Sequence, residues 1–154
     1  MNSIADFLNC ERIAISGVSA RNPEQSAANA IYNRLRTAGY RVYPINPNTE
    51  KIGEQVCYPD VFALPERPDG IVIVNRPDVA ERIVQQCVQA EIERVWLHRS
   101  FGTGSVSSRA VDIAKQGGLR VIAGGCPMMF IQPVDTGHRC MRWILEKMKR
   151  IPVN

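Results

Sequence analysis

The sequence lacks any long apolar run, and this absence argues against a membrane partner. No uninterrupted apolar stretch approaches the roughly 18 residues that a transmembrane helix needs. The opening residues, MNSIADFLNCER, contain acids and no basic leader, so we expect no secretory signal. Both absences favour a cytoplasmic protein.

Cysteine is present, but it is not arranged in pairs. The five cysteines are widely spread, odd in number and never form C-x-x-C; they are Cys10, Cys57, Cys87, Cys126 and Cys140. This spacing argues against a zinc knuckle and against a disulfide framework. We therefore expect free thiols in a reducing cytoplasm, and no metal site.

The familiar catalytic motifs are also missing. There is no H-E-x-x-H, and neither a Ser-His-Asp set nor a paired-carboxylate site can be argued from the sequence. The net charge of +4 is too small to indicate a nucleic-acid partner without a clustered basic stripe. It suits a modest anion such as a phosphorylated cofactor.

Short runs rich in Val and Ile recur along the chain and predict a sheet. They cover residues 12–16, 41–46, 70–75, 94–98 and 119–124. Most are apolar at nearly every position, as in strands buried on both faces. Helical patterns lie at about 25–38, 77–90, 105–116 and 135–150. The alternation predicts an α/β fold, a Rossmann-like doubly wound parallel sheet of about five strands with flanking helices.

The chain length, and the residues that typically begin and end helices, agree with a single domain over residues 1–154 that ends in a helix at about 135–150. Gly39 and Gly117 fit the position just past a helix end. Pro77 and Asp78 suit a first helical turn, and Asp135 suits an N-cap. Residues 51–66 break the alternation and predict a turn, a brief extended piece and one helical turn.

The strand ends predict a ligand edge without carboxylates. In an open α/β sheet the ligand lies outside the carboxyl ends of the strands. Gly17 lets the backbone approach a phosphate there, Ser19 adds a hydroxyl donor, and the following helix supplies free N–H groups. Arg21, Lys51 and Arg76 are candidates to neutralise phosphate charge, the alternative being that they are solvated loop cations.

Two further absences bear on the identity of the nucleotide. Only Gly17 stands where a dinucleotide fingerprint needs three glycines, and Asn46-Pro47 stands where an NAD site places an acid. NAD is therefore disfavoured. NADP fits better, with Lys51 near its 2′-phosphate, but the missing glycines count against it. An adenine nucleotide with a 3′-phosphate and a less tightly packed diphosphate loop fits these residues better.

These features together resemble the CoA-binding domain family, small stand-alone Rossmann-like proteins related to the nucleotide domain of the succinyl-CoA ligase α subunit. The resemblance runs from about Arg12 to Phe130. It rests on IAISGVSARNP, GYRVYPINPNTEKIGEQVCYP, PDGIVIVNRP and VWLHRSFG, in that order. It implies coenzyme A, or an acyl-CoA, as the ligand.

The resemblance also implies roles for the residues at four strand ends. The loop of Gly17, Val18 and Ser19 would hold the diphosphate, and the residues after the second strand would line the adenosine and 3′-phosphate. The residues after the third strand would border the pantetheine arm or its phosphates, and the loop from His98 to Phe101 would flank the same cleft. With Arg21, the expected ligand-binding residues are Gly17, Val18, Ser19, Arg21, Asn46, Pro47, Lys51, Val74, Asn75, Arg76 and His98.

The chain departs from this family after the fifth strand. AGGCPMMF (123–130) stands where many relatives have a D-x-C-like segment and an acid-His pair, and it looks more like the N-C-P-G-type turn of the ligases. The phosphate-carrying His of the ligase lies in a second domain, for which this chain has no room. We therefore do not expect ligase activity.

Two residues stay candidates for chemistry. A thiol at Cys126 could form a mixed disulfide with CoA or accept an acyl group, if a cation or a helix N-terminus lowered its pKa. His98 could act as a base toward a thioester. The alternative for Cys126 is that it is a small packing residue at a tight turn, and the alternative for His98 is that it is a hydrogen-bonded wall residue. His138 is expected on the surface. We predict a binding module first. The alternatives are an enzyme or redox module acting on a CoA thioester or disulfide through Cys126, and an NADP-binding oxidoreductase.

The last helix has a mixed surface. Its apolar face is formed by residues at helical spacing, namely Met141, Ile144, Leu145 and Met148. Trp143 stands among basic residues, namely Arg139, Arg142, Lys147, Lys149 and Arg150. Such a face either packs on a partner or covers the sheet with solvated cations on its outer side. Both a homodimer and a complex with a partner enzyme therefore remain possible interpretations.

Overall fold

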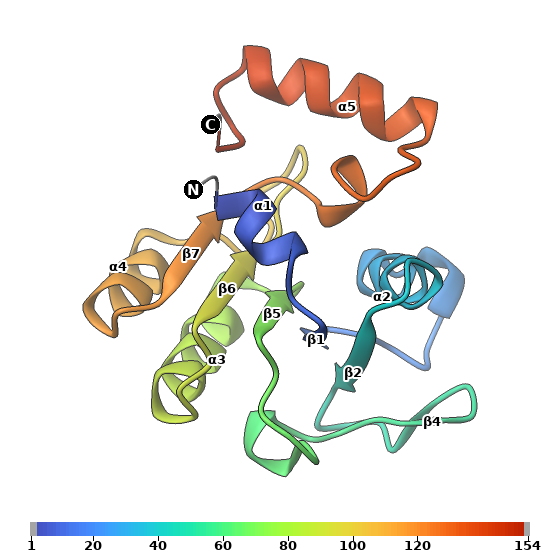
Figure 1. Ribbon diagram of the computed structural model, residues 1–154, viewed down its shortest axis with the longest axis vertical. Helices are drawn as coiled ribbons and strands as arrows, with labels where there is room; N and C mark the ends of the chain where they lie inside the picture. The colour runs from blue at the N-terminus through green and yellow to red at the C-terminus, as the bar shows by residue number, and fades with distance from the viewer. Residues whose placement is uncertain (1–2, 153–154) are drawn as a thin grey trace.

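Five parallel strands form the centre of the structure, a computed structural model that describes residues 3–152 (Figure 1). They are β1 (Arg12–Ser16), β2 (Arg41–Ile45), β5 (Gly70–Ile73), β6 (Arg94–Leu97) and β7 (Arg120–Ala123). Their order in the sheet is β2-β1-β5-β6-β7, and every neighbouring pair is parallel. The predicted fold class and the five predicted strands are confirmed.

Helices cover both faces of this sheet (Figure 1). Those longer than two turns are α2 (Ala27–Thr37), α3 (Pro77–Gln89), α4 (Ser108–Gln116) and α5 (Thr136–Lys147), all at predicted places. The helix predicted from residue 105 starts later because the Ser107 side chain caps it, accepting a hydrogen bond from the Ala110 N–H at 3.0 Å. The short helix α1 (Ser3–Leu8) was not predicted.

The segment after β2 contains the extended piece and the helical turn that were predicted for residues 51–66. The extended piece is a small antiparallel hairpin of β3 (Lys51–Ile52) and β4 (Gln55–Val56). The helical turn is the 3₁₀ helix η2 (Val61–Ala63). Two more 3₁₀ turns, η1 (Pro23–Gln25) and η3 (Pro127–Met129), precede α2 and α5.

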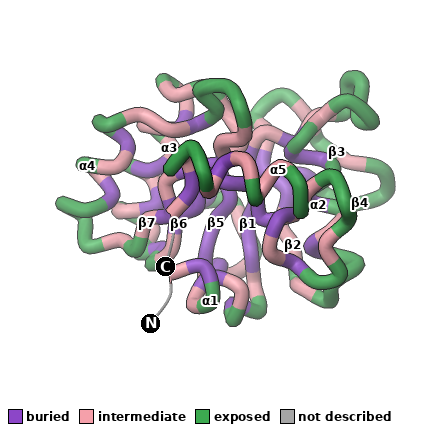
Figure 2. The backbone as a smooth tube through the Cα atoms, turned by 90° about the horizontal axis from the view of Figure 1, so that it is seen from above, coloured by how far each residue is buried: buried purple, intermediate pink, exposed green. Residues whose placement is uncertain are grey.

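The core consists of two apolar layers, one on each side of the sheet, whose buried strands run through the middle of Figure 2. Side chains alternate along β1, so Ile13 and Ile15 face the layer under α1, α2 and α5, whereas Ala14 faces the layer under α3 and α4. The fully buried Trp96 packs edge-on against Phe7 of α1, with ring centroids 5.3 Å apart. This contact holds α1 on the sheet.

The four long helices end in the same hydrogen-bond pattern, a Schellman motif with one left-handed residue past the helix. Gly39 occupies that position after α2, as predicted, with φ +96°. After α4 the prediction was wrong by one residue, because Gly118 takes the position with φ +76°. Gly117 is needed for packing instead, since a Cβ there would lie 2.4 Å from a methyl of Val88 on α3.

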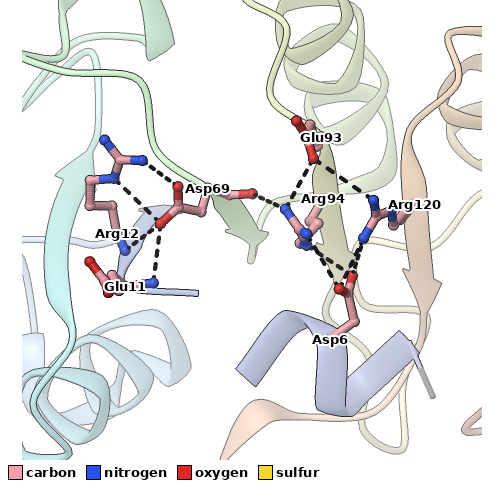
Figure 3. A network of polar contacts seen from close by, with 7 residues as sticks. All are labelled: Asp6, Glu11, Arg12, Asp69, Glu93, Arg94 and Arg120. Atoms are coloured by element: carbon pink, nitrogen blue, oxygen red, sulfur yellow. Dashed lines mark hydrogen bonds and ion pairs between the residues drawn. The ribbon is translucent and has the colours of Figure 1, made fainter. Parts of the chain in front are cut away.

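The amino edge of the sheet carries a network of ion pairs (Figure 3). Four strands begin with an arginine, and each arginine meets an acid. Arg12 lies 2.5 Å from Asp69, and Arg94 lies 2.8 Å from Asp6 of α1. The hydrogen bond from Arg12 is the largest cause holding the pKa of Asp69 down at about 2. Because its charges are paired, this edge offers little to a charged ligand.

Candidate functional site

The strand order places a ligand crevice between β1 and β5. The chain leaves β1 toward α2 on one face of the sheet and leaves β5 toward α3 on the other, so the connections diverge there. Ligands of open α/β sheets bind at such a switch point, outside the carboxyl ends of the strands. Gly17 follows β1 and Val74 follows β5, so two segments predicted to share a site do lie side by side.

Gly17 is the tightest point of this crevice. Its backbone has φ +98°, and a Cβ at this position would lie only 2.1 Å from the Val74 carbonyl oxygen. The Val74 N–H donates to the Ser16 carbonyl at 3.0 Å, which fixes the approach of the two segments. Val18 is fully buried in the core and anchors the loop. One glycine is therefore required here by geometry.

A chain of partly buried hydrogen bonds ties the crevice together. The Ser16 hydroxyl bonds the Asn75 side-chain oxygen. The Asn75 N–H donates to the Ser105 hydroxyl at 2.9 Å, and that hydroxyl donates to the Asn75 carbonyl at 2.7 Å. Ser16 and Ser105 were not predicted as site residues. Ser16 could have been noticed as a polar residue ending a buried strand, whereas Ser105 carries no signal of its partner.

The loop after β1 is held by its own polar groups. The Ser19 N–H donates to the Asn29 side chain at 2.8 Å, and the Asn29 amide donates back to the Ser19 carbonyl at 2.8 Å. The Ser19 hydroxyl donates to the Arg21 carbonyl and accepts from the Arg21 N–H. Ser19, predicted as a donor to phosphate, thus shapes the loop. The side chain of Ser26 caps α2 by accepting from the Asn29 N–H.

Asn46 joins the end of β2 to the same loop. Its amide donates to the Val18 carbonyl at 2.6 Å, and its side-chain oxygen accepts from the Asn48 N–H at 2.8 Å. Pro47 is exposed beside it, and Lys51 opens the adjacent hairpin. The residues predicted after the first two strands are therefore brought together at one rim.

The cations of this rim differ from those of the amino edge. Within residues 3–152, Arg21 and Lys51 are exposed and have no ion-pair partner. Arg76 lies 3.2 Å from Asp78, but its side chain is 80% exposed and the pair is weak. These three side chains are free to turn toward an anion.

Two candidates for chemistry lie deeper than the rim cations. His98 is only 9% exposed, and burial lowers its pKa to about 4, so the ring is neutral at pH 7. Cys126 is 4% exposed, and burial is the largest cause raising the pKa of its thiol to about 11. Cys126 packs in the core with Met129 and Ile131. Near neutral pH the Cys126 thiol is protonated and therefore a poor nucleophile, and an imidazole with a pKa of about 4 is only a weak base.

Arg150, which follows α5, braces the loop that follows β6. The Arg150 guanidinium donates to the carbonyls of Phe101 and Gly102 at 2.5 and 2.8 Å. In return the Arg150 carbonyl accepts from Arg99 at 2.9 Å. Sequence reasoning missed this clamp, because it joins residues about fifty positions apart with no motif between them.

A hollow of about 500 Å³ lies away from the rim, along the outer edge of β2 and beside the hairpin. Arg41 in its wall is paired with Glu66 at 2.8 Å, and Tyr43 bonds the same carboxylate. Two of the polar side chains in its wall are thus already engaged. We place the candidate site at the carboxyl rim, where strand topology and unpaired cations coincide.

Comparison with known proteins gives a consistent match. A model described as a CoA binding domain matches residues 11–132. The chain is 27% identical over 126 residues to acetate–CoA ligase [ADP-forming] II of Archaeoglobus fulgidus, covering 77% of this chain and 18% of the ligase. The corresponding ligase of Methanocaldococcus jannaschii is 25% identical over 117 residues, covering 73% of this chain and 17% of the ligase. The chain thus spans less than a fifth of these relatives.

Solved structures give the same match. A hypothetical protein of Pyrococcus horikoshii OT3 aligns with a TM-score of 0.74 and 26% identity, over 83% of this chain and 88% of that one. Acetyl-coenzyme A synthetase 1 of Ca. Korarchaeum cryptofilum, solved with phosphate and ADP, aligns with a TM-score of 0.67 and 26% identity. That alignment covers 80% of this chain and 28% of the synthetase. In residues 3–152, no helix is both long and apolar enough to span a membrane.

Proposed function

The chain belongs to the CoA binding domain family, and on that premise we propose that it holds coenzyme A or an acyl-CoA at the carboxyl edge of its sheet. The observation that carries this proposal is the crevice at Gly17, which lies within the matched residues at the switch point between β1 and β5. The diphosphate would lie over the loop of Gly17, Val18 and Ser19. The pantetheine arm or its phosphates would pass Val74, Asn75 and Arg76.

The charges of the rim support a ligand with several phosphates. Arg21 stands on the loop after β1, and Lys51 stands on the hairpin after β2. Asn46 and Pro47 lie between them and would line the adenosine. Lys51 would then meet the 3′-phosphate, which distinguishes CoA from NAD. A lysine ammonium is a mobile point charge and suits a phosphate at the exposed end of a ligand.

The proposal includes a binding role without a catalytic one. A thiol with a pKa of about 11 is ionised at pH 7 in roughly one molecule in ten thousand, so Cys126 is a poor nucleophile. His98 lies at the same edge but is buried and neutral. Its place there is consistent with a wall of the cleft. All five cysteines are free, which suits the cytoplasmic location that forms part of the proposal.

Calorimetry with CoA, acetyl-CoA, NAD and NADP tests the ligand class. We expect CoA and acetyl-CoA to bind more tightly than either nicotinamide nucleotide. Tighter binding of NAD than of CoA would overturn the proposal, and tighter binding of NADP would favour the oxidoreductase alternative.

Dephospho-CoA tests the residue assigned to the 3′-phosphate. Lys51→Gln should weaken CoA binding by roughly tenfold, as expected from losing one charge-assisted contact of about 1.5 kcal/mol. It should leave the affinity for dephospho-CoA unchanged, because that ligand has no 3′-phosphate. Lys115→Gln, at an exposed position on α4, is the matched control. Equal losses for both ligands would remove Lys51 from this role.

A further inference from the structure

Helix α5 lies outside the residues that match the family and adds a surface of its own. It packs on the sheet through Leu145, which is fully buried, with Met141 packed against the same layer. The opposite side presents Trp143 with 61% of its surface exposed. Tryptophan is enriched among the residues that anchor protein interfaces.

A groove of about 480 Å³ runs beside this tryptophan. Met129, Pro133 and Val134 from the segment before α5 line one side. Trp143 and Arg139 of the helix line the other. Gln132, Arg142 and Glu146 complete the lining, so the groove combines apolar side chains with polar and charged ones. Its volume is enough for a large apolar side chain.

The free charge around the groove is positive. Arg142 is paired with Glu146 at 2.7 Å and stacks 4.5 Å from the centre of the Phe130 ring. Within the part of the chain that the structure describes, the nearby cations Arg139, Lys147 and Lys149 have no ion-pair partner. The acids of α5 and its cap are already engaged, since Asp135 binds His138 at 2.6 Å.

From this arrangement we propose that the groove beside Trp143 is a docking site for an acidic segment of a partner protein, with one large apolar side chain between carboxylates. The apolar side chain would fill the groove against Trp143. The carboxylates would pair with Arg139 on one side and Lys147 on the other, which stand one helical turn before and after the tryptophan. Charge complementarity of this kind selects partners and speeds their encounter.

Two other occupants fit less well. A second copy placed across a two-fold axis at Trp143 would set Arg139 of one chain opposite Lys147 of the other, so like charges would meet. A membrane surface requires a broad apolar face to insert. The apolar face of α5 is turned into the core, except that Met148, predicted to belong to it, lies at the helix end and is exposed. The large exposed apolar side chains here are therefore Trp143 and Met148.

A fluorescently labelled peptide of Asp and Glu with one central Leu tests the proposal by anisotropy. We expect it to bind at least tenfold more tightly than the same peptide with Ser in place of Leu. Acrylamide quenching gives an independent readout, because Trp96 is fully buried and Trp143 is the exposed tryptophan. Peptide binding should protect Trp143 from the quencher. The measurement needs no CoA, so its outcome is separate from that of the proposed function.

Variants decide whether the contact is specific. Trp143→Ser and the double variant Arg139→Glu with Lys147→Glu should each weaken peptide binding by at least tenfold. Lys115→Glu on α4 makes a charge reversal elsewhere and should bind like the parent. Circular dichroism checks that all are folded. The proposal is overturned by no binding, by equal binding in the charge variants, by a stable dimer in sedimentation, or by preference for phosphatidylserine vesicles over the peptide.

Discussion

At the residue scale, one glycine decides the shape of the candidate site. Sequence patterns predicted that Gly17 lies in a phosphate loop, but they could not show what the glycine avoids. The structure supplies the reason, because the Val74 carbonyl occupies the space that a side chain would need. The signal for this contact comes from another strand, so no local pattern contains it.

Gly17→Ala should lower the free energy of unfolding by more than about 2 kcal/mol, because it combines left-handed backbone strain with an overlap at 2.1 Å. Urea unfolding measures this loss. Gly39→Ala is a matched control with nearly the same dihedral, φ +96°, but no atom within 4 Å of the added Cβ. It should cost about 1 kcal/mol, from the backbone alone. Equal losses in the two variants would show that the contact with Val74 does not matter.

At the scale of elements, two helix ends are less stable than they could be, because a residue other than glycine adopts the left-handed conformation there. Two of the four Schellman motifs use glycine, but α3 and α5 end with Glu91 at φ +55° and Lys149 at φ +54°. Non-glycine residues are strained in this region. Glu91 also pairs with Arg67 at 3.5 Å, but both side chains are mostly exposed and the pair contributes little.

Glu91→Gly should therefore raise the free energy of unfolding by about 0.5–1 kcal/mol. The increase would be visible as a higher urea midpoint with an unchanged slope. Glu91→Ala removes the same ion pair but keeps the Cβ, so it should bring no such gain. A gain of the same size in both variants would assign the effect to the ion pair instead of the backbone.

The elements that sequence patterns predicted are those whose signal is local. The five strands and four long helices have apolar runs, caps or terminal glycines within their own residues. α1 has six residues, and its place depends on Phe7 meeting Trp96 and on Asp6 meeting Arg94. The same limit applies to the site. The rim was predictable because parallel strand ends share an edge, whereas the bonds from Ser105 to Asn75 were not.

At the scale of the whole molecule, paired and unpaired charges are separated between the two edges of the sheet. The arginines that begin four strands are held by acids at the amino edge, and among the described residues 3–152 no ion-pair partner is found for Arg21 or Lys51 at the carboxyl edge. The modest net charge of +4 hides this separation. Composition alone could not have revealed it, because it depends on which arginines find a partner.

The amino edge should make the protein sensitive to acid. The hydrogen bond from Arg12 lowers the folded pKa of Asp69 to about 2, below the ordinary value for an aspartate. A depressed carboxyl pKa adds stability above the unfolded value, and that stability is lost as pH falls from about 5 to 2. For this partly buried group the loss is about 2 kcal/mol. Asp69→Asn should thus be less stable at pH 5 and lose less on acidification than the parent.

Urea unfolding at pH 5 and at pH 2.5 measures that difference. Asp112→Asn, at an exposed position on α4, is the control and should follow the parent at both pH values. Protonation of His98, whose folded pKa of about 4 lies below the unfolded value, is common to all three proteins and cancels in the comparison. A parallel pH dependence in Asp69→Asn and the parent would contradict the assignment.

The bonds between Arg150 and the loop after β6 have a thermodynamic consequence. They connect the turn that ends α5 to a segment flanking the candidate ligand rim. If occupation of the rim changes the order of that loop, the same change reaches the helix whose outer side bears Trp143. The coupling between two binding sites is reciprocal. A partner bound on the helix would then change the affinity for the nucleotide by the same factor by which the nucleotide changes the affinity for that partner.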